Sequence, residues 1–376
     1  MAISSRSLRF VLLFASIALP GFFAARNLAT FPARVHYPGE LDYVEGSVLA
    51  EMVHLREGIR IYAPASADRF DAALYGPLFY LLCSPLVDTQ RPGYFLLRGV
   101  SLLATLGLAA GCALLAVWRV RSYLSAVIAT LLFLSYSFVA VFGTLARCDA
   151  MALLLSFSGF LVAYRFQNSR RILAAVPLMT LGFCYKQQFV SAPLAVLLFL
   201  ILEKRFRLAA EFAALLGLAG LSLLAVFQFL IFPHQAFLLH LFAYNAIPFS
   251  WQDGERWALN LCVIFLVPAA VGIHSLRAQP NRLLACYIGC LALLLPMMMA
   301  KKGTALNYAL ELPLVLCPLF AGQLAARLPR PSHAGLFLFL LAVTLMFANP
   351  FPVPVPQAKD LIQNNAVQDF LRENGG

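Results

Sequence analysis

Residues 95–118 read FLLRGVSLLATLGLAAGCALLAVW, an apolar run in which Arg98 is the only charged residue. An α-helix rises 1.5 Å per residue, so about 20 consecutive apolar residues cross the hydrocarbon core of a bilayer. The run is long enough for this, and its single charge lies near one end. We therefore expect a transmembrane helix here.

Similar runs recur along the whole chain of 376 residues, which is 61% hydrophobic and only 12% charged. The mean hydropathy of +0.81 is far above that of a soluble domain. We predict an all-α, polytopic transmembrane helical bundle at residues 1–348. The roughly eleven spans expected from run length are residues 10–25, 95–118, 123–143, 150–166, 172–184, 190–202, 208–232, 258–274, 283–299, 310–326 and 334–348. The first of them also reads as a cleaved signal peptide.

The charges indicate which side each loop faces. Threading the chain through these spans puts 14 of the 28 lysines and arginines on one side, opposed by Glu203 alone, with Glu211 just inside the adjoining span. The positive-inside rule makes that side cytosolic. The net charge of +11 is thereby explained without nucleic acid as a partner. The outer side receives two long segments, 26–94 and 233–257, and a tail at 349–376.

Two of these outer segments are expected to hold helices of their own. In the first outer loop, residues 43–57 fit an amphipathic helix and residues 75–82 are an aromatic run too short to span, so both are predicted to lie along the interface. Leu361, Ile362, Phe370 and Leu371 predict a short amphipathic helix in the extracytoplasmic tail. The eight cysteines occur singly and the histidines lack ligand spacing, so neither a zinc site nor a disulfide framework is implied.

Three acids, Glu40, Asp42 and Glu45, open the first outer loop. Carboxylates are costly to desolvate, so a group of them beside a bilayer needs a reason. At spacing i, i+3 on a helix, Asp42 and Glu45 would share a face and present two carboxylates to one substrate hydroxyl or one divalent metal ion. The alternative is structural, with Asp42 as the N-cap and Glu45 as the N3 residue of a capping box.

Three further polar islands are predicted at the same membrane depth. They are Arg147-Cys148-Asp149, Lys186-Gln187, and Lys301-Lys302-Gly303-Thr304-Ala305-Leu306-Asn307-Tyr308. Taken singly, a basic residue at the end of a span most often reaches toward lipid headgroups. Taken together, the islands predict an outward pocket with cations for a phosphate and carboxylates for proton transfer.

The order of these motifs resembles the GT-C superfamily of integral-membrane glycosyltransferases, including its bacterial protein-mannosyltransferase-like and aminoarabinose-transferase-like members. The resemblance rests on five short elements in order. They are Glu40-Leu41-Asp42-Tyr43-Val44-Glu45-Gly46 with Gly58-Ile59-Arg60-Ile61-Tyr62, then Tyr75-Gly76-Pro77-Leu78-Phe79-Tyr80, then Ala146-Arg147-Cys148-Asp149, then Lys186-Gln187, and last Asn307-Tyr308-Ala309-Leu310-Glu311-Leu312. Many members carry adjacent acids in the first loop, whereas Asp42 and Glu45 are separated here.

The resemblance implies inverting transfer of a sugar from a polyprenyl-phosphate donor to a lipid, glycan or protein acceptor, on the extracytoplasmic face of a bacterial inner membrane. Asp42 or Glu45 would then remove the acceptor proton, and Asp149 would orient the acceptor or a metal ion. The substrate-binding residues would be Glu40, Tyr75, Arg147, Lys186, Gln187, Lys301, Asn307 and Tyr308. The main alternative is a secondary transporter or flippase, although no internal repeat is visible and the acids gather in a loop. A non-catalytic scaffold would leave the acidic loop unexplained.

Overall fold

The computed structural model describes residues 5–64, 73–350, 352–357, 359–360 and 362. Throughout this part of the chain the regular elements are helices, and no strand is present. The helix predicted in the tail falls mainly on Leu361, Phe370 and Leu371, which lie outside the described residues. The α-helices are α1 (Ser5–Leu28), α2 (Phe31–His36), α3 (Tyr43–Arg56), α4 (Pro77–Cys83), α5 (Phe95–Val120), α6 (Tyr123–Ser135), α7 (Ser137–Phe142), α8 (Asp149–Arg165), α9 (Val176–Tyr185), α10 (Ser191–Leu202), α11 (Phe206–Ala225), α12 (Trp251–Ala278), α13 (Arg282–Met299), α14 (Glu311–Arg327) and α15 (Pro331–Ala348).

Seven helical segments are long and apolar enough to cross a membrane, as expected of an integral membrane protein. In the described residues they are Ser7–His36, Phe95–Val120, Phe206–Ile231, Trp251–Ala278, Arg282–Met299, Leu306–Arg327 and Pro331–Ala348. The predicted count of about eleven is therefore matched only in part. The other four predicted spans do form helices, but α8 has 17 residues and α10 has 12, and the helix expected at 123–143 is divided into α6 and α7 at Tyr136. The fourth consists of the ten-residue α9 and a preceding 3-10 turn.

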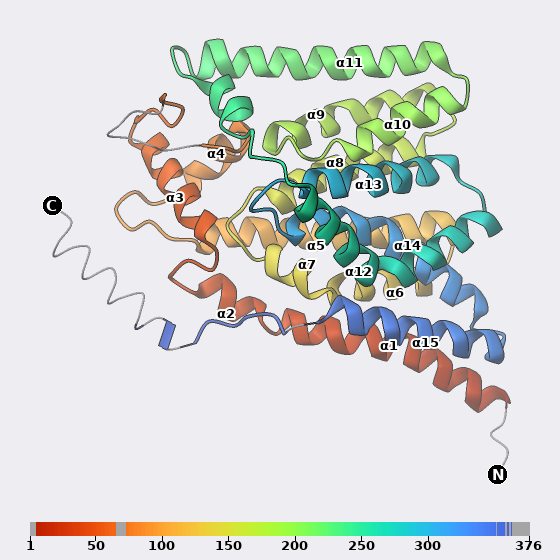
Figure 1. Cartoon of the computed structure of the whole chain (residues 1–376). Helices are drawn as coiled ribbons and strands as arrows, with labels where there is room; N and C mark the ends of the chain where they lie inside the picture. The colour runs from red at the N-terminus through yellow and green to blue at the C-terminus, as the bar shows by residue number, and fades with distance from the viewer. Residues whose placement is uncertain (1–4, 65–72, 351, 358, 361, 363–376) are drawn as a thin grey trace.

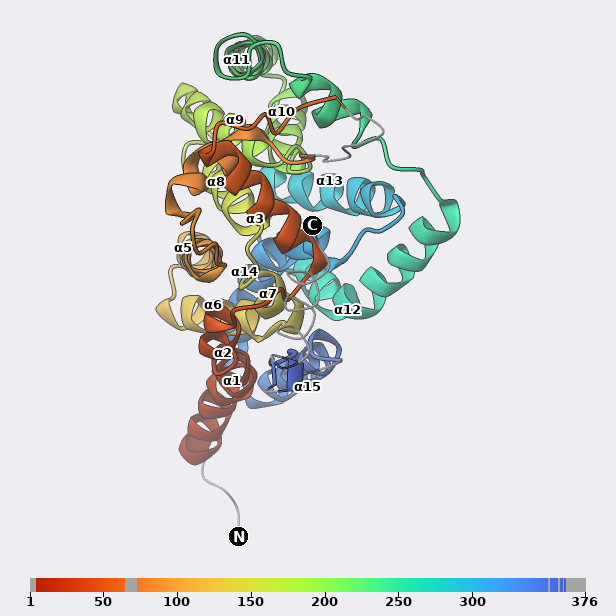
Figure 2. The same cartoon turned by 90° about the vertical axis from the view of Figure 1, so that its left-hand side faces the viewer.

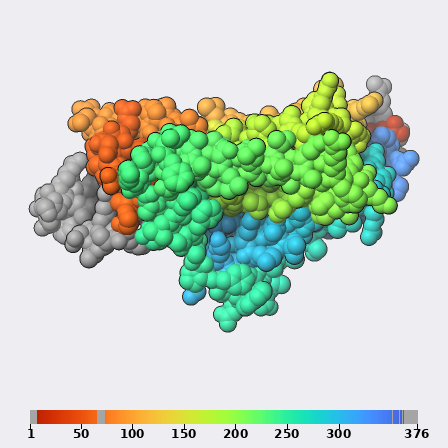
Figure 3. Space-filling view, turned by 90° about the horizontal axis from the view of Figure 1, so that it is seen from above, coloured from red at the N-terminus to blue at the C-terminus, as the bar shows by residue number. Residues whose placement is uncertain are grey.

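The long helices run roughly side by side, and Figure 2 looks along several of them. Helix α14 lies at the centre, where most of its residues are buried and it packs against α5, α6, α12, α13 and α15. Helix α11 forms a ridge on the outside of the bundle, with most of its apolar side chains exposed (Figure 3). The apolar surface of α11 is appropriate for contact with lipid.

The short helices α3 and α4 gather at one end of the bundle, beside the starts of α5 and α8 (Figure 1). Both begin where the sequence favours a helix start, because Asp42 caps α3 with its carboxylate and Pro77 occupies the first position of α4. Helices thus form at both stretches of the first outer loop where they were predicted, and their position along the membrane interface stays a prediction. They form one wall of the cavity described next.

Candidate active site

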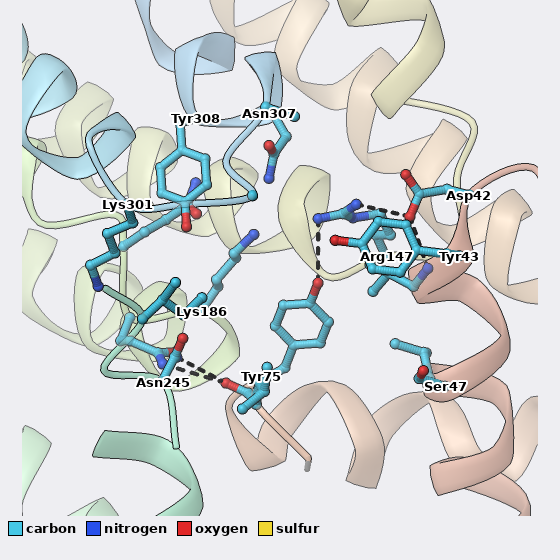
Figure 4. A pocket seen from close by; sticks show the side chains of 18 of the residues that line it. Asp42, Tyr43, Ser47, Tyr75, Arg147, Lys186, Asn245, Lys301, Asn307 and Tyr308 are labelled. Carbon is cyan, nitrogen blue, oxygen red and sulfur yellow. Dashed lines mark hydrogen bonds and ion pairs between the residues drawn. The ribbon is translucent and has the colours of Figure 1, made fainter. Parts of the chain in front are cut away.

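A cavity of about 370 Å³ opens at the end of the bundle that carries α3 and α4 (Figure 4). Its walls come from segments far apart in the sequence: α3, the turn before α4, the turn before α8, the turn after α9, and the two stretches around positions 245 and 301–308. Eight of the predicted site residues line it: Asp42, Tyr75, Arg147, Lys186, Gln187, Lys301, Asn307 and Tyr308. The predicted polar islands thus meet in one place.

Asp42 is both a helix cap and a cavity residue. Its Oδ1 accepts hydrogen bonds from the Val44 backbone N–H (3.0 Å) and from Arg147 Nη1 (3.1 Å). Its side chain remains 22% exposed, and within the described residues Oδ2 accepts no hydrogen bond. Figure 4 shows this carboxylate beside Tyr43 at the cavity wall. One oxygen of Asp42 is therefore available to a ligand.

Glu45 lies one turn further along α3, but its side chain is fully buried and does not line the cavity. Oε1 accepts from Arg98 Nε (2.9 Å) and from the Ala146 N–H (2.6 Å). Oε2 accepts from Arg98 Nη2 (2.6 Å) and from the Leu41 N–H (2.7 Å). The capping box is not formed as predicted either, because the carboxylate bonds the N–H before the N-cap. Proton transfer by Glu45 therefore has no support in the geometry, and we reassign this residue to positioning.

Glu45 is paired with Arg98, and this pair positions the segments around the cavity. Arg98 is fully buried, and its remaining N–H groups donate to the carbonyl oxygens of Arg34, Tyr37 and Gly39. This pair ties the start of α5 to the chain before α3 and, through Ala146, to the turn that carries Arg147. The pair therefore fixes the distance between the acidic and basic walls of the cavity.

Asp149, the first residue of α8, lies behind the cavity wall. Its Oδ1 accepts from Lys186 Nζ (2.5 Å) and from Asn307 Nδ2 (2.7 Å), and its Oδ2 accepts from Arg147 Nε (3.1 Å). Burial raises the pKa of this carboxyl, but Lys186 and Arg147 outweigh that effect and hold the pKa below its usual range. Since both oxygens are occupied, Asp149 holds the two cations in place and is poorly suited to act as a base.

Arg147 bridges the acids and the aromatic wall. Besides Asp42 and Asp149 it donates to the Tyr75 hydroxyl at 3.3 Å. Burial lowers the pKa of Arg147, but the neighbouring carboxylates raise it by more. The net pKa is therefore raised and the guanidinium stays charged. Burial also raises the pKa of Tyr75 well above 10, which keeps its hydroxyl neutral.

A glycine brings Tyr75 against Lys186. A Cβ on Gly76 would lie 1.9 Å from the carbonyl oxygen of Cys184, so only glycine allows the turn before α4 to approach the end of α9. The Gly76 N–H donates to the Tyr185 carbonyl at this contact. As a result Lys186 Nζ lies 5.2 Å from the ring centroid of Tyr75, and 5.5 Å from that of Tyr308.

Lys301 supplies a third cation to the cavity. It lies half-buried on a turn held by an antiparallel bridge to Phe249. Within the described residues it makes no ion pair, in contrast to Arg147 and Lys186. Glu40 departs from its prediction. It is exposed, lies outside the cavity lining and accepts a hydrogen bond from Tyr94 Oη.

Several lining residues escaped the sequence analysis, among them Tyr43, Ser47, Glu51, Gln188 and Asn245. Ser47 and Glu51 follow Val44 at helical spacing, which was a usable signal. Tyr43 is the first residue of α3, whereas Gln188 and Asn245 lie in turns without a period. Gln187 and Gln188 each bury an amide oxygen that finds no partner in the described part of the chain, so two acceptors remain for a ligand.

No group of three metal-ligating side chains gathers anywhere in the described residues. Asp42 and Asp149 are paired with arginine or lysine instead. Comparisons with protein-family models, with curated proteins and with solved structures find no match to this chain.

Proposed function

We propose that the protein is a membrane glycosyltransferase of the GT-C type, which moves a sugar from a polyprenyl-phosphate donor to a lipid, glycan or protein acceptor. The observation that carries this proposal is the cavity itself, which Asp42, whose Oδ2 has no described partner, lines together with the cations Arg147, Lys186 and Lys301. We place the cavity on the extracytoplasmic side of a bacterial inner membrane, as the positive-inside rule favours.

The reaction needs a base on one side and a phosphate site on the other. In the proposed step the acceptor hydroxyl attacks the anomeric carbon, the bond from that carbon to the phosphate oxygen breaks, and the hydroxyl proton passes to Asp42 Oδ2. One displacement of this kind inverts the anomeric centre. The polyprenyl phosphate leaves with the bonding electron pair, and nearby cations stabilise its new charge.

The charges of the site fit such a phosphate. Arg147 and Lys186 are balanced by Asp42 and Asp149, with which they are paired. Lys301 lines the cavity and enters no described ion pair, while Glu51 adds a third carboxylate near the two paired ones. We assign Lys301 to the donor phosphate, because its ammonium is not held by a carboxylate of the described residues. The free amide oxygens of Gln187 and Gln188 suit the hydroxyl groups of a sugar.

The proposal is tested by mass spectrometry of envelope glycans and lipid-linked sugars from cells with and without the gene. Loss of the gene should remove one glycan species and raise one lipid-linked sugar. Asp42→Asn should fail to restore the glycan, because Asn keeps the helix cap but removes the proton acceptor, a loss of about 10²–10⁴-fold.

Asp88→Asn is the matched control. Asp88 also accepts a backbone N–H two residues on, from Gln90 at 2.9 Å, and lies in the same outer loop but outside the cavity. It should restore the glycan fully. Unchanged glycans in cells lacking the gene, or full restoration by Asp42→Asn, would contradict the proposal.

A further inference from the structure

A second cavity, of about 900 Å³, is lined by residues where α5 and α8 end and α6 begins. These helix ends lie at the opposite end of the bundle from α3 and α4 (Figure 1). Helix α8 starts at Asp149 beside the candidate active site and ends at Arg165, which lines this second cavity. Its 17 residues span roughly 25 Å at 1.5 Å per residue. The two cavities therefore lie near opposite surfaces of a hydrocarbon core about 30 Å thick.

The second cavity is strongly basic. Arg121, Arg165 and Arg171 line it and are exposed, and no carboxylate belongs to its described lining. None of the three makes an ion pair within the described residues, whereas neighbouring Arg170 is paired with Glu211 at 3.3 Å. The positive charge of these three arginines is therefore available to attract an anionic ligand.

Local structure makes these arginines converge. Arg165 and Arg171 both lie over the ring of Phe166, with their guanidinium carbons 5.8 and 6.0 Å from its centroid. Arg121 reaches the same cavity from the C-cap of α5, where it adopts the left-handed conformation with φ 51°. Guanidinium groups bind phosphate oxygens in pairs of parallel hydrogen bonds, so such a group suits a phosphate ligand.

The surroundings favour a lipid over a soluble phosphate. Trp118 stacks on Tyr164 in the cavity wall, and Tyr123 is 84% exposed, as is typical of aromatic residues at headgroup level. Leu114 and Val127 lie one turn deeper on the same faces of α5 and α6, and both are exposed. These two side chains would meet the acyl chains of a lipid whose headgroup fills the cavity.

We propose that this cavity binds the phosphodiester headgroup of an anionic glycerophospholipid from the adjoining leaflet. Basic pockets between membrane helices commonly take such headgroups. The site is separate from the glycosyltransfer proposed above and does not depend on it.

Native mass spectrometry of the full-length protein in detergent tests the assignment, with phosphatidylglycerol and phosphatidylcholine of identical acyl chains as probes. Wild type should retain phosphatidylglycerol preferentially. The triple variant Arg121→Gln, Arg165→Gln and Arg171→Gln should retain roughly tenfold less. A control triple variant, Arg170→Gln, Arg207→Gln and Arg277→Gln, removes the same charge from exposed positions outside the cavity and should stay within about twofold of wild type.

A competition experiment with a soluble phosphate ester distinguishes a lipid site from a site for soluble phosphates. Millimolar glycerol 3-phosphate should leave phosphatidylglycerol bound, because it lacks acyl chains; displacement would show a soluble-phosphate site and overturn the assignment to a lipid. If both triple variants lost phosphatidylglycerol equally, its binding would reflect general surface charge, and the proposed site would be wrong. Full retention in the first triple variant would also overturn the proposal.

Discussion

Asp42 and Glu45 lie one turn apart on α3, yet their carboxylates meet different surroundings. Glu45 is enclosed by four donors, whereas Asp42 keeps one oxygen toward the cavity. The sequence predicted that both acids matter, with a helix cap by Asp42 as the structural alternative, and the structure shows that Asp42 does cap α3. Their separate roles could not be predicted, because the partner of Glu45 is 53 positions away in α5.

Glu45→Gln should destabilise the fold by about 3–5 kcal/mol, because it leaves the buried guanidinium of Arg98 without its counter-charge. Thermal unfolding followed by size-exclusion chromatography in detergent measures this loss. Glu57→Gln, an exposed position at the C-cap of α3, should unfold like wild type. A stable Glu45→Gln protein that had lost sugar transfer would instead identify Glu45 as the base.

Lys301→Gln should weaken binding of a radiolabelled polyprenyl phosphate by about 10-fold or more, since a hydrogen bond to a charged group contributes about 1.5–3 kcal/mol. Lys302→Gln is the control, because Lys302 is the exposed neighbour and does not line the cavity. Equal binding by both variants would remove Lys301 from the phosphate site.

At the level of elements, apolar run length predicted most long helices correctly. It could not predict that 123–143 is interrupted at Tyr136, where the backbone is extended, because both halves of that run are equally apolar. Nor could it predict how the two outer loops join. The Ala236 N–H donates to the Tyr62 carbonyl at 2.8 Å, and His240 Nε2 contacts the Ala63 carbonyl at 2.7 Å.

This junction between loops should loosen in acid. Burial lowers the pKa of His240 below its ordinary 6.5, so the closed junction favours the neutral imidazole. Below about pH 6.5 the opened form takes up a proton that the closed form resists, and stability falls as the pH falls. After correction for intrinsic rates, hydrogen exchange at Ala236 should therefore accelerate on acidification. His240→Asn should abolish the pH dependence, and the same slope in that variant would exclude His240 as its cause.

For the whole molecule, the order of polar islands predicted that several distant segments share one surface. Asn307 reaches Asp149 across 158 positions, and Lys186 reaches it across 37. No periodicity links such positions, because their contact depends on how α8, α9 and α14 pack. The sequence alone could therefore suggest a shared site but could not establish it. The same packing places a basic cavity at one end of the bundle and the candidate active site at the other.

The orientation of the bundle in the membrane decides whether its two ends can have the proposed roles. Gln90 is exposed beside the start of α5, at the end that carries the candidate active site, and Asn168 is exposed at the basic end, just after α8. Helix α5 has 26 residues, or roughly 39 Å, so these ends lie on opposite sides of a bilayer. In intact spheroplasts a membrane-impermeant maleimide should label Gln90→Cys, and it should label Asn168→Cys only after lysis, since basic loops stay in the cytosol. Wild type, whose eight cysteines are mostly buried, sets the background. Labelling of Asn168→Cys alone in intact spheroplasts would turn the active site toward the cytosol and exclude transfer on the outer face.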